Sequence, residues 1–123
     1  MYKLLAIIGL FFTAACYQVE RNCSDFKTGK FKTELSVNNQ KQTVIFERTE
    51  NLEITFGTPK NDTASLRWIN DCEYIVQQLH PKNKAEEKAV HIKILTTDSD
   101  SYTFEFSLVG NPKKQKSIAY KIN

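Results

Sequence analysis

The chain has few of the residues from which catalytic and metal sites are usually built. Its 123 residues include four glycines, three cysteines and two histidines. Four glycines leave little room for a glycine-rich loop that cradles phosphate, and the G-x-S-x-G and H-E-x-x-H patterns of hydrolases are absent. No Cys-x-x-Cys pair or Cys/His cluster is present, so the sequence does not predict a zinc site. We therefore expect no metal, no cofactor and no dedicated catalytic residue.

The chain also lacks an excess of charge of one sign. Its 17 Lys and Arg against 14 Asp and Glu give a formal net charge of +3. Proteins that bind nucleic acid usually carry a strong basic field. The near balance therefore argues against nucleic acid as a partner.

A hydrophobic run long enough to cross a membrane is missing as well. The longest apolar stretch, residues 4–12, has nine residues, whereas a helix that spans a bilayer needs about 20. Lys3 precedes this stretch, and small residues end it directly before Cys16. This pattern is typical of a cleaved secretory signal, and the segment resembles the lipobox of bacterial lipoproteins.

The lipobox resemblance implies cleavage before Cys16, thioether lipidation of Cys16 and a palmitate-type acyl chain on its amino group. The chain then divides into a signal peptide at 1–15, a lipidated tether at 16–24 and a single β domain at 25–123. Residues 17–24 lack the acidic run typical of surface-exported Bacteroidetes lipoproteins, which favours an outer-membrane anchor facing the periplasm. The alternatives are a soluble secreted protein with Cys16 inside an ordinary signal, and a buried N-terminal segment with a chance cysteine.

The remaining cysteines, Cys23 and Cys72, form a candidate disulfide. Disulfides persist in oxidising compartments such as the bacterial periplasm. A bridge between them closes a loop of about 50 residues, which is worth roughly 3–4 kcal/mol in the chain-entropy model. The alternative is two buried free thiols, which pack as small hydrophobic groups.

From residue 25 onward, apolar and polar residues alternate as in half-buried strands. The expected inward rows are Phe31, Thr33, Leu35 and Val37; Val44 and Phe46; Leu52, Ile54 and Phe56; Ala64, Leu66 and Trp68; Tyr74 and Val76; Val90, Ile92, Ile94 and Thr96; Tyr102, Phe104, Phe106 and Leu108; and Ile118, Tyr120 and Ile122. These rows predict an all-β fold of about eight antiparallel strands in a meander.

Closing the meander into a small lipocalin-like barrel would remove its two edges. Pro81 and the Ala- and Glu-rich residues after it predict one short helical turn near 81–88. The alternative is an open sheet packed under that helical segment.

An eight-stranded barrel is either filled by side chains or holds one small ligand. A cavity of about 300 Å³ or more would favour ligand binding, and a filled interior would favour docking of a partner on the surface. The aromatic residues of the rows are candidates either for a packed core or for the lining of an apolar cavity. They are Phe31, Phe46, Phe56, Trp68, Tyr74, Phe104, Phe106 and Tyr120.

The charged residues give weaker signals. Five basic residues form either a basic rim or ordinary solvated surface: Arg48, Arg67, Lys113, Lys114 and Lys116. Glu53, Glu73 and His91 are candidates for an enzyme, but the alternation places all three opposite the apolar rows. The triplet Asp62-Thr63-Ala64 resembles the O-glycosylation acceptor of exported Bacteroidetes proteins, with Thr63 as the acceptor.

Four stretches carry a family resemblance: NCSDFKTGKF at 22–31, RWINDCEY at 67–74, KILTT at 93–97 and SYTFEF at 101–106. They resemble an uncharacterised family of small, flavobacterial-type Bacteroidetes lipoproteins, over nearly all of the domain. Some members carry an automatic label of DNA topoisomerase IV. The chain is too short for strand breakage, carries an export signal and is nearly neutral, so we judge that label a misannotation. The TGKF segment at 28–31 is also faintly similar to the Gly-x-Trp opening of lipocalins.

These observations favour a non-catalytic envelope lipoprotein. Its partners are then the lipid bilayer, through Cys16, and either a small apolar ligand or an envelope protein. The alternatives are a minor envelope enzyme and an inert structural lipoprotein.

Overall fold

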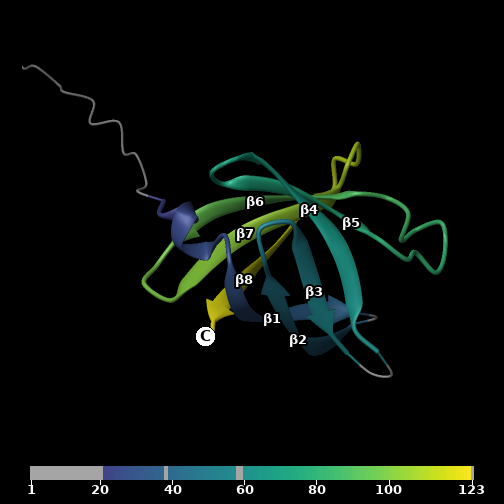
Figure 1. Cartoon of the computed structure of the whole chain (residues 1–123), viewed down its shortest axis with the longest axis horizontal. Helices are drawn as coiled ribbons and strands as arrows, with labels where there is room; N and C mark the ends of the chain where they lie inside the picture. Colours follow the sequence, from purple (N-terminus) through teal and green to yellow (C-terminus); the bar gives the residue numbers. More distant parts are fainter. Residues whose placement is uncertain (1–20, 38, 58–59, 123) are drawn as a thin grey trace, which may run out of the picture.

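The computed structural model describes residues 21–122 except 38, 58 and 59, so Cys16 and the expected signal peptide lie outside the described residues. Eight antiparallel strands form a closed barrel in sequence order (Figure 1). The strands are β1 (Gly29–Val37), β2 (Gln40–Arg48), β3 (Leu52–Phe56), β4 (Asp62–Asn70), β5 (Glu73–Gln78), β6 (Val90–Thr97), β7 (Ser101–Leu108) and β8 (Gln115–Lys121). The predicted all-β meander is therefore confirmed, and the open-sheet alternative is wrong.

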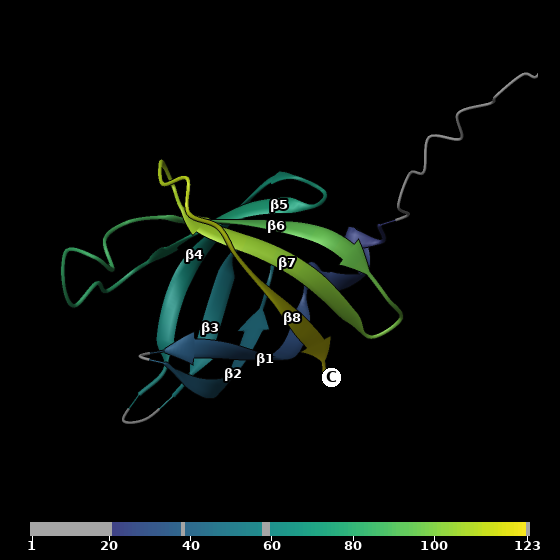
Figure 2. The ribbon, with the colours of Figure 1, turned by 180° about the vertical axis from the view of Figure 1, so that it is seen from behind.

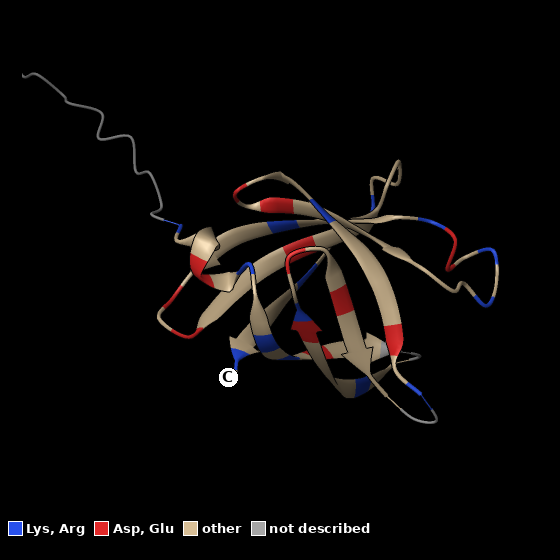
Figure 3. Ribbon diagram, viewed as in Figure 1, with Lys and Arg blue, Asp and Glu red and all other residues tan. Residues whose placement is uncertain are grey.

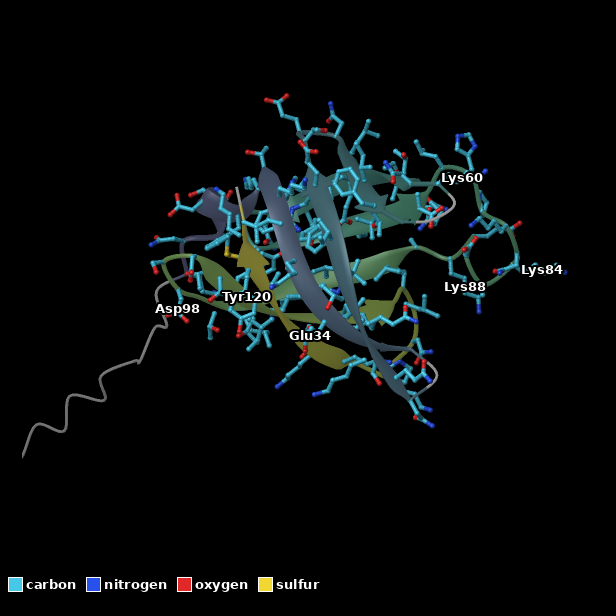
Figure 4. The ribbon with its side chains drawn as sticks, turned by 90° about the horizontal axis from the view of Figure 1, so that it is seen from below. Glu34, Lys60, Lys84, Lys88, Asp98 and Tyr120 are labelled. Carbon is cyan, nitrogen blue, oxygen red and sulfur yellow. A yellow bond between two sulfur atoms is a disulfide. The ribbon has the colours of Figure 1, made fainter. Side chains whose placement is uncertain are left out.

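The two ends of the barrel differ. One end, here named the plug end, carries the 3-10 helix η1 (Cys23–Phe26), three short turns and the last described residues (Figure 1). The other, the loop end, carries the longer connections at 57–61, 79–89 and 109–114. In Figure 4, Asp98 lies at the plug end, whereas Lys60, Lys84 and Lys88 lie at the loop end.

The helix η1 closes the plug end from inside. Phe26 is 1% exposed and packs against Tyr102, with ring centroids 5.2 Å apart. The predicted Cys23–Cys72 disulfide is present and joins η1 to the β4–β5 turn, with Cα atoms 5.2 Å apart. Lys121 Nζ at the end of β8 donates to the Asp25 carbonyl at 3.0 Å. The residues that begin the domain are thereby fixed to both β5 and β8.

The predicted helical turn near 81–88 is wrong. Residues 84–87 form hydrogen-bonded turns instead, in which Glu87 N donates to Lys84 O and Lys88 N to Ala85 O, both at 3.3 Å. Almost every side chain in this loop is exposed. A single helical turn has a costly nucleus and needs an apolar face to pack on, whereas this loop buries little and is tied to the barrel mainly by polar contacts such as Gln77 Nε2 to Glu87 O at 3.1 Å.

Two strands present the opposite face from the one expected. Directly paired residues on antiparallel strands share a face, and β3 pairs Glu53 with Arg48 and Thr55 with Phe46. Glu53 and Thr55 therefore point inward, and the expected row of Leu52, Ile54 and Phe56 points outward, with Phe56 36% exposed.

Strand β8 shows the same inversion. Ala119 pairs with both Thr33 and Tyr102 and is fully buried. The expected inward row is instead on the outer face, where its members are 44–46% exposed: Ile118, Tyr120 and Ile122.

Smaller features follow the local sequence. A register shift between Ile94 and Thr96 in β6 leaves Thr96 exposed rather than in the inward row. Asn39 has φ of 63° in the β1–β2 turn, a left-handed conformation that Asn tolerates. Asn38 and the side chain of Val37 lie outside the description. In the described part of the chain, η1 is far too short to cross a bilayer, and no other helix is long and apolar enough to do so.

Candidate functional site

A buried arginine lies inside the plug end of the barrel. The sequence places Arg48 either at a basic rim or on ordinary solvated surface, but its side chain is 1% exposed and points inward. Nη1 donates to the hydroxyl of Tyr74 at 2.7 Å and to that of Tyr102 at 2.8 Å, and Nη2 donates to the Phe26 carbonyl. Its Nε has no partner among the described residues. Both alternatives are therefore wrong for this residue.

Aromatic rings surround the guanidinium. Its central carbon lies 4.4 Å from the ring centroid of Phe31 and 5.0 Å from that of Tyr74. Both distances are within the range of cation–π attraction. Arg48 is thus held by ring faces as well as by hydrogen bonds.

The alternation of β2 itself carries Arg48 inward. Val44 and Phe46 face the interior, and Arg48 is the next residue of the same period-two row. The period-two pattern of the sequence therefore indicated an inward Arg48, although a charged residue at the end of a strand is ordinarily exposed to solvent.

Glu53 on β3 faces the same interior. It is the direct cross-strand partner of Arg48 and lines the cavity described below. No hydrogen bond reaches its carboxylate from the described residues, and no ion pair within 4 Å joins it to Arg48. We refer to Arg48, Glu53, Tyr74 and Tyr102 as the polar cluster.

Burial dominates the titration of the polar cluster. Burial raises the pKa of Glu53 above its ordinary value of 4.5, and the charge of Arg48 offsets part of that rise. Burial also raises the pKa of Tyr74 and of Tyr102, again against the charge of Arg48. For Arg48, burial alone lowers the pKa, but Tyr74, Tyr102 and Glu53 outweigh it and the pKa is raised. The guanidinium therefore stays charged, and both phenols stay neutral at physiological pH.

A cavity of about 170 Å³ extends from the polar cluster toward the loop end. Its wall is almost entirely apolar, and among the described residues that line it Glu53 is the only charged one. The lining residues are Thr33, Leu35, Val44, Phe46, Glu53, Tyr74, Val90, Ile92, Tyr102, Phe104 and Phe106. The interior is thus neither fully filled nor as large as the roughly 300 Å³ of typical drug-sized sites.

The eight aromatic candidates for the interior divide into three groups. Phe46, Tyr74, Phe104 and Phe106 line the cavity. Phe31 and Trp68 belong to the core beside it. Phe56 and Tyr120 are on the outer face of the barrel, so their assignment to the interior is wrong.

A groove of about 730 Å³ runs along the outer side of the seam between β1 and β8. Figure 2 shows β8 between β7 and β1, and Figure 4 places Glu34 and Tyr120 on this side of the barrel. Backbone pairing across the seam covers 31–33 of β1, and one further backbone hydrogen bond runs from Ile122 N to Lys30 O at 2.9 Å. Beyond it the Thr33 and Ser117 hydroxyls, 2.9 Å apart, bridge the strands. Thr33, Leu35 and Phe106 line both groove and cavity, so these side chains lie between the two spaces.

The other charged candidates lie outside the barrel. His91 Nε2 and Glu73 Oε2 are 3.2 Å apart on the outer face of β5 and β6, as the alternation predicts. Arg67 is exposed on β4, and Lys113, Lys114 and Lys116 are exposed at the loop end, so the basic residues do not form one rim. Figure 3 shows both signs of charge interspersed over the ribbon.

Thr63 occupies a position that a modification could reach. It is paired with Ile54 on the outer face near the start of β4. Among the described residues, no three Cys, His, Asp or Glu side chains gather in a way that could hold a metal ion.

Sequence reasoning names Glu53 as an enzyme candidate but places it opposite the inward row, which is wrong because Glu53 lines the cavity. Leu52, Ile54 and Phe56 are far more apolar than Glu53 and Thr55, so the pattern alone points to the wrong face. The inward position of Glu53 follows only from that of Arg48, with which Glu53 pairs across the short β2–β3 turn.

Comparisons of the chain with protein-family models, with curated proteins and with solved structures found no match. The function must therefore be argued from the geometry of the barrel itself.

Proposed function

We propose that this protein is a non-catalytic barrel that binds a small ligand and is held in the bacterial envelope by lipid on Cys16. One observation carries the binding role, namely the apolar cavity beside the polar cluster. Small-molecule sites are concave and mostly apolar, with a few polar groups that set orientation. The cavity has this composition, with Glu53 as the charged group in an otherwise apolar wall.

The volume limits the ligand. An engineered apolar cavity of about 150 Å³ is large enough for benzene, so about 170 Å³ suits a molecule near the size of one substituted ring. Fatty acids and other long-chain lipids are too large for this space.

The inward position of Glu53 supports a second candidate, a minor enzyme, more than the sequence does. A buried carboxyl with a raised pKa is a frequent general acid or base. Acid–base catalysis usually also needs a second group aimed at the substrate, and the hydroxyls of Tyr74 and Tyr102 are already bonded to Arg48. We therefore favour binding over catalysis.

The test compares two adjacent substitutions on β2 in binding of toluene, followed by NMR chemical shifts. Val44 lines the cavity, whereas Ile45 is half-buried on the opposite face. Val44→Phe should abolish toluene binding because it fills the space, and Ile45→Phe should leave it unchanged. Equal loss in both variants, or no binding by the unmodified protein, would overturn the proposal. Native mass spectrometry of protein from its own envelope would then identify a co-purifying molecule.

Partner docking is the remaining possibility for the same barrel. The outer face of β8 exposes Ile118, Tyr120 and Ile122 beside the seam groove. An extended segment of an envelope protein with apolar residues at alternate positions is the partner that such a strand face would accept. An empty cavity together with a co-purifying protein would favour this role.

The envelope location and the O-glycosylation of Thr63 are part of the same proposal. The lipobox resemblance supports lipid on Cys16, and the half-buried position of Thr63 on the outer face of the barrel suits an O-glycan. We further propose that the chain is a member of the small Bacteroidetes lipoproteins that it resembles. Intact mass of the native protein would reveal both the acyl chains and the glycan.

A further inference from the structure

We propose that the cavity ligand is a compact neutral molecule with an apolar body and one hydrogen-bond donor, a hydroxyl or N–H group, which the Glu53 carboxylate accepts. This inference rests on the proposed binding function and specifies the chemistry of the ligand.

Glu53 gives the cavity wall unused hydrogen-bonding capacity. Glu53 lines the cavity, and no hydrogen bond from the described residues reaches its carboxylate. A carboxylate has about four lone-pair sites, and the Glu53 oxygens are not fully enclosed by protein atoms, so a ligand in the cavity can reach them. A donor on the ligand would supply the missing hydrogen bond.

The other polar groups of the cavity wall offer less acceptor capacity, because their oxygens already take part in hydrogen bonds. The Thr33 hydroxyl donates to the Ile118 carbonyl at 2.8 Å and lies beside Ser117. The hydroxyl oxygens of Tyr74 and Tyr102 accept from Arg48. Glu53 is thus the lining residue with the most acceptor capacity left.

The charged groups around Glu53 limit the charge that a ligand can carry. The charged and titratable groups around Glu53 are Arg48 from β2, Tyr74 from β5 and Tyr102 from β7. Glu53 already balances the charge of Arg48, so an ammonium ligand would add a second cation to an interior of low dielectric constant. An anionic ligand would meet the carboxylate and could not reach Arg48, which is 1% exposed and enclosed by aromatic rings. A neutral donor avoids both conflicts.

The cavity wall also limits the shape of the ligand. Phe46, Phe104 and Phe106 line the cavity together with aliphatic side chains. Such walls favour a flat or compact apolar body through dispersion and stacking. A phenol is the simplest molecule that combines this body with a donor.

The experiment compares four probes of similar size: phenol, toluene, benzylammonium and benzoate. The full chain with Cys16→Ala is used, so that neither an acyl chain nor detergent competes for the probes. Affinities are measured from NMR shifts at about pH 8, well above ordinary carboxyl pKa values. We expect phenol to bind at least about tenfold more tightly than toluene, because a hydrogen bond to a charged acceptor is among the stronger ones.

Variants assign that preference to Glu53. In Glu53→Leu the phenol-to-toluene ratio should fall to about one. Glu53→Gln, whose amide oxygen still accepts, should give an intermediate ratio and serves if the leucine variant does not fold. Glu47→Leu, on the outer face of the same hairpin, is the matched control and should keep the full ratio.

The outcomes separate this inference from the proposed function. If toluene binds as tightly as phenol, or if benzylammonium or benzoate binds best, the ligand class is wrong although the barrel still binds small molecules. An unchanged phenol preference in Glu53→Leu would also overturn it. If no probe binds, the binding function fails and the inference fails with it.

Discussion

Arg48 is a cation at a position that water does not reach. A buried charge loses several kcal/mol of solvation unless neighbouring groups replace the water. Here two phenol oxygens, one backbone carbonyl and four ring faces surround the guanidinium, and Glu53 supplies the opposite charge nearby. The polar cluster therefore stabilises the fold only as a unit.

Arg48→Met should lower the free energy of unfolding by about 3–5 kcal/mol, the usual cost of breaking a buried charged network. The phenol oxygens lose their donor, and the charge of Glu53 loses its balance. Chemical denaturation measures the change. Arg67→Met, at an exposed position on β4, is the control and should stay within about 0.5 kcal/mol. A small effect of both substitutions would contradict a structural role for the cluster.

Glu53 should make stability depend on pH in a recognisable direction. Burial raises its folded-state pKa above 4.5, the ordinary value that the unfolded chain retains. At pH values between 4.5 and the higher folded-state pKa of Glu53, the folded protein keeps a proton that the unfolded chain releases. The free energy of unfolding therefore falls as the pH rises through this range. Urea unfolding between about pH 4 and pH 8 measures this fall. Glu53→Gln should remove it, and parallel curves for the two proteins would contradict the assignment.

At the scale of the elements, η1 and β3 determine what the interior is like. The helix η1 supplies the ring and the carbonyl of Phe26 to the polar cluster, and β3 supplies the acidic group, Glu53. The short β2–β3 turn fixes the register that places Glu53 opposite Arg48, with Thr49 N donating to Leu52 O at 2.9 Å. A slip of one residue would send Glu53 to the outer face.

Removal of the disulfide by Cys23→Ala and Cys72→Ala should lower the free energy of unfolding by roughly 3–4 kcal/mol in the chain-entropy model. It should also raise hydrogen exchange at the amides of 26–29, because the bridge ties η1 to the β4–β5 turn. Ser24→Ala is the control, because Ser24 is exposed in η1 next to Cys23. Unchanged exchange at the plug would show that Phe26 packing alone holds it in place.

At the scale of the whole molecule, the two ends of the barrel differ in what they carry. The described chain begins at the plug end, where Arg21 Nη1 donates to Ile94 O at 3.1 Å and Asn22 N to Thr97 Oγ1 at 2.9 Å. Five residue steps separate Cys16 from Arg21, which limits the tether to about 18 Å. Under the proposed anchoring, the plug end faces the bilayer and the loop end points away from it.

Cys16→Ala should move the protein from the membrane fraction to the soluble periplasmic fraction, because the substitution removes the thioether-linked lipid. Fractionation followed by immunoblotting measures this change. The Cys23→Ala and Cys72→Ala double variant is the control, since it removes two other cysteines and should stay with the membrane. If Cys16→Ala fractionates like the unmodified protein, the proposed anchor is wrong.

Much of this fold could be predicted from the sequence, because period-two alternation and polar turns are local properties. They determine the eight strands, the antiparallel meander and the inward rows of β1, β2, β4, β5 and β7. The cysteine count, with Cys16 assigned to lipid, predicts the Cys23–Cys72 pair. The loop at 81–88 was mispredicted because helical propensity decides little without a surface to pack on.

The tertiary structure alone decided which face of β3 and of β8 is inward. Alternation separates two faces but does not say which one is buried when the apolar row lies outside, as Leu52, Ile54 and Ile118 do. That choice comes from the register with neighbouring strands around a closed barrel, where each strand must match two partners. Burial of Arg48, the inward position of Glu53, and the volume of the cavity between them and the loop end follow from that closure.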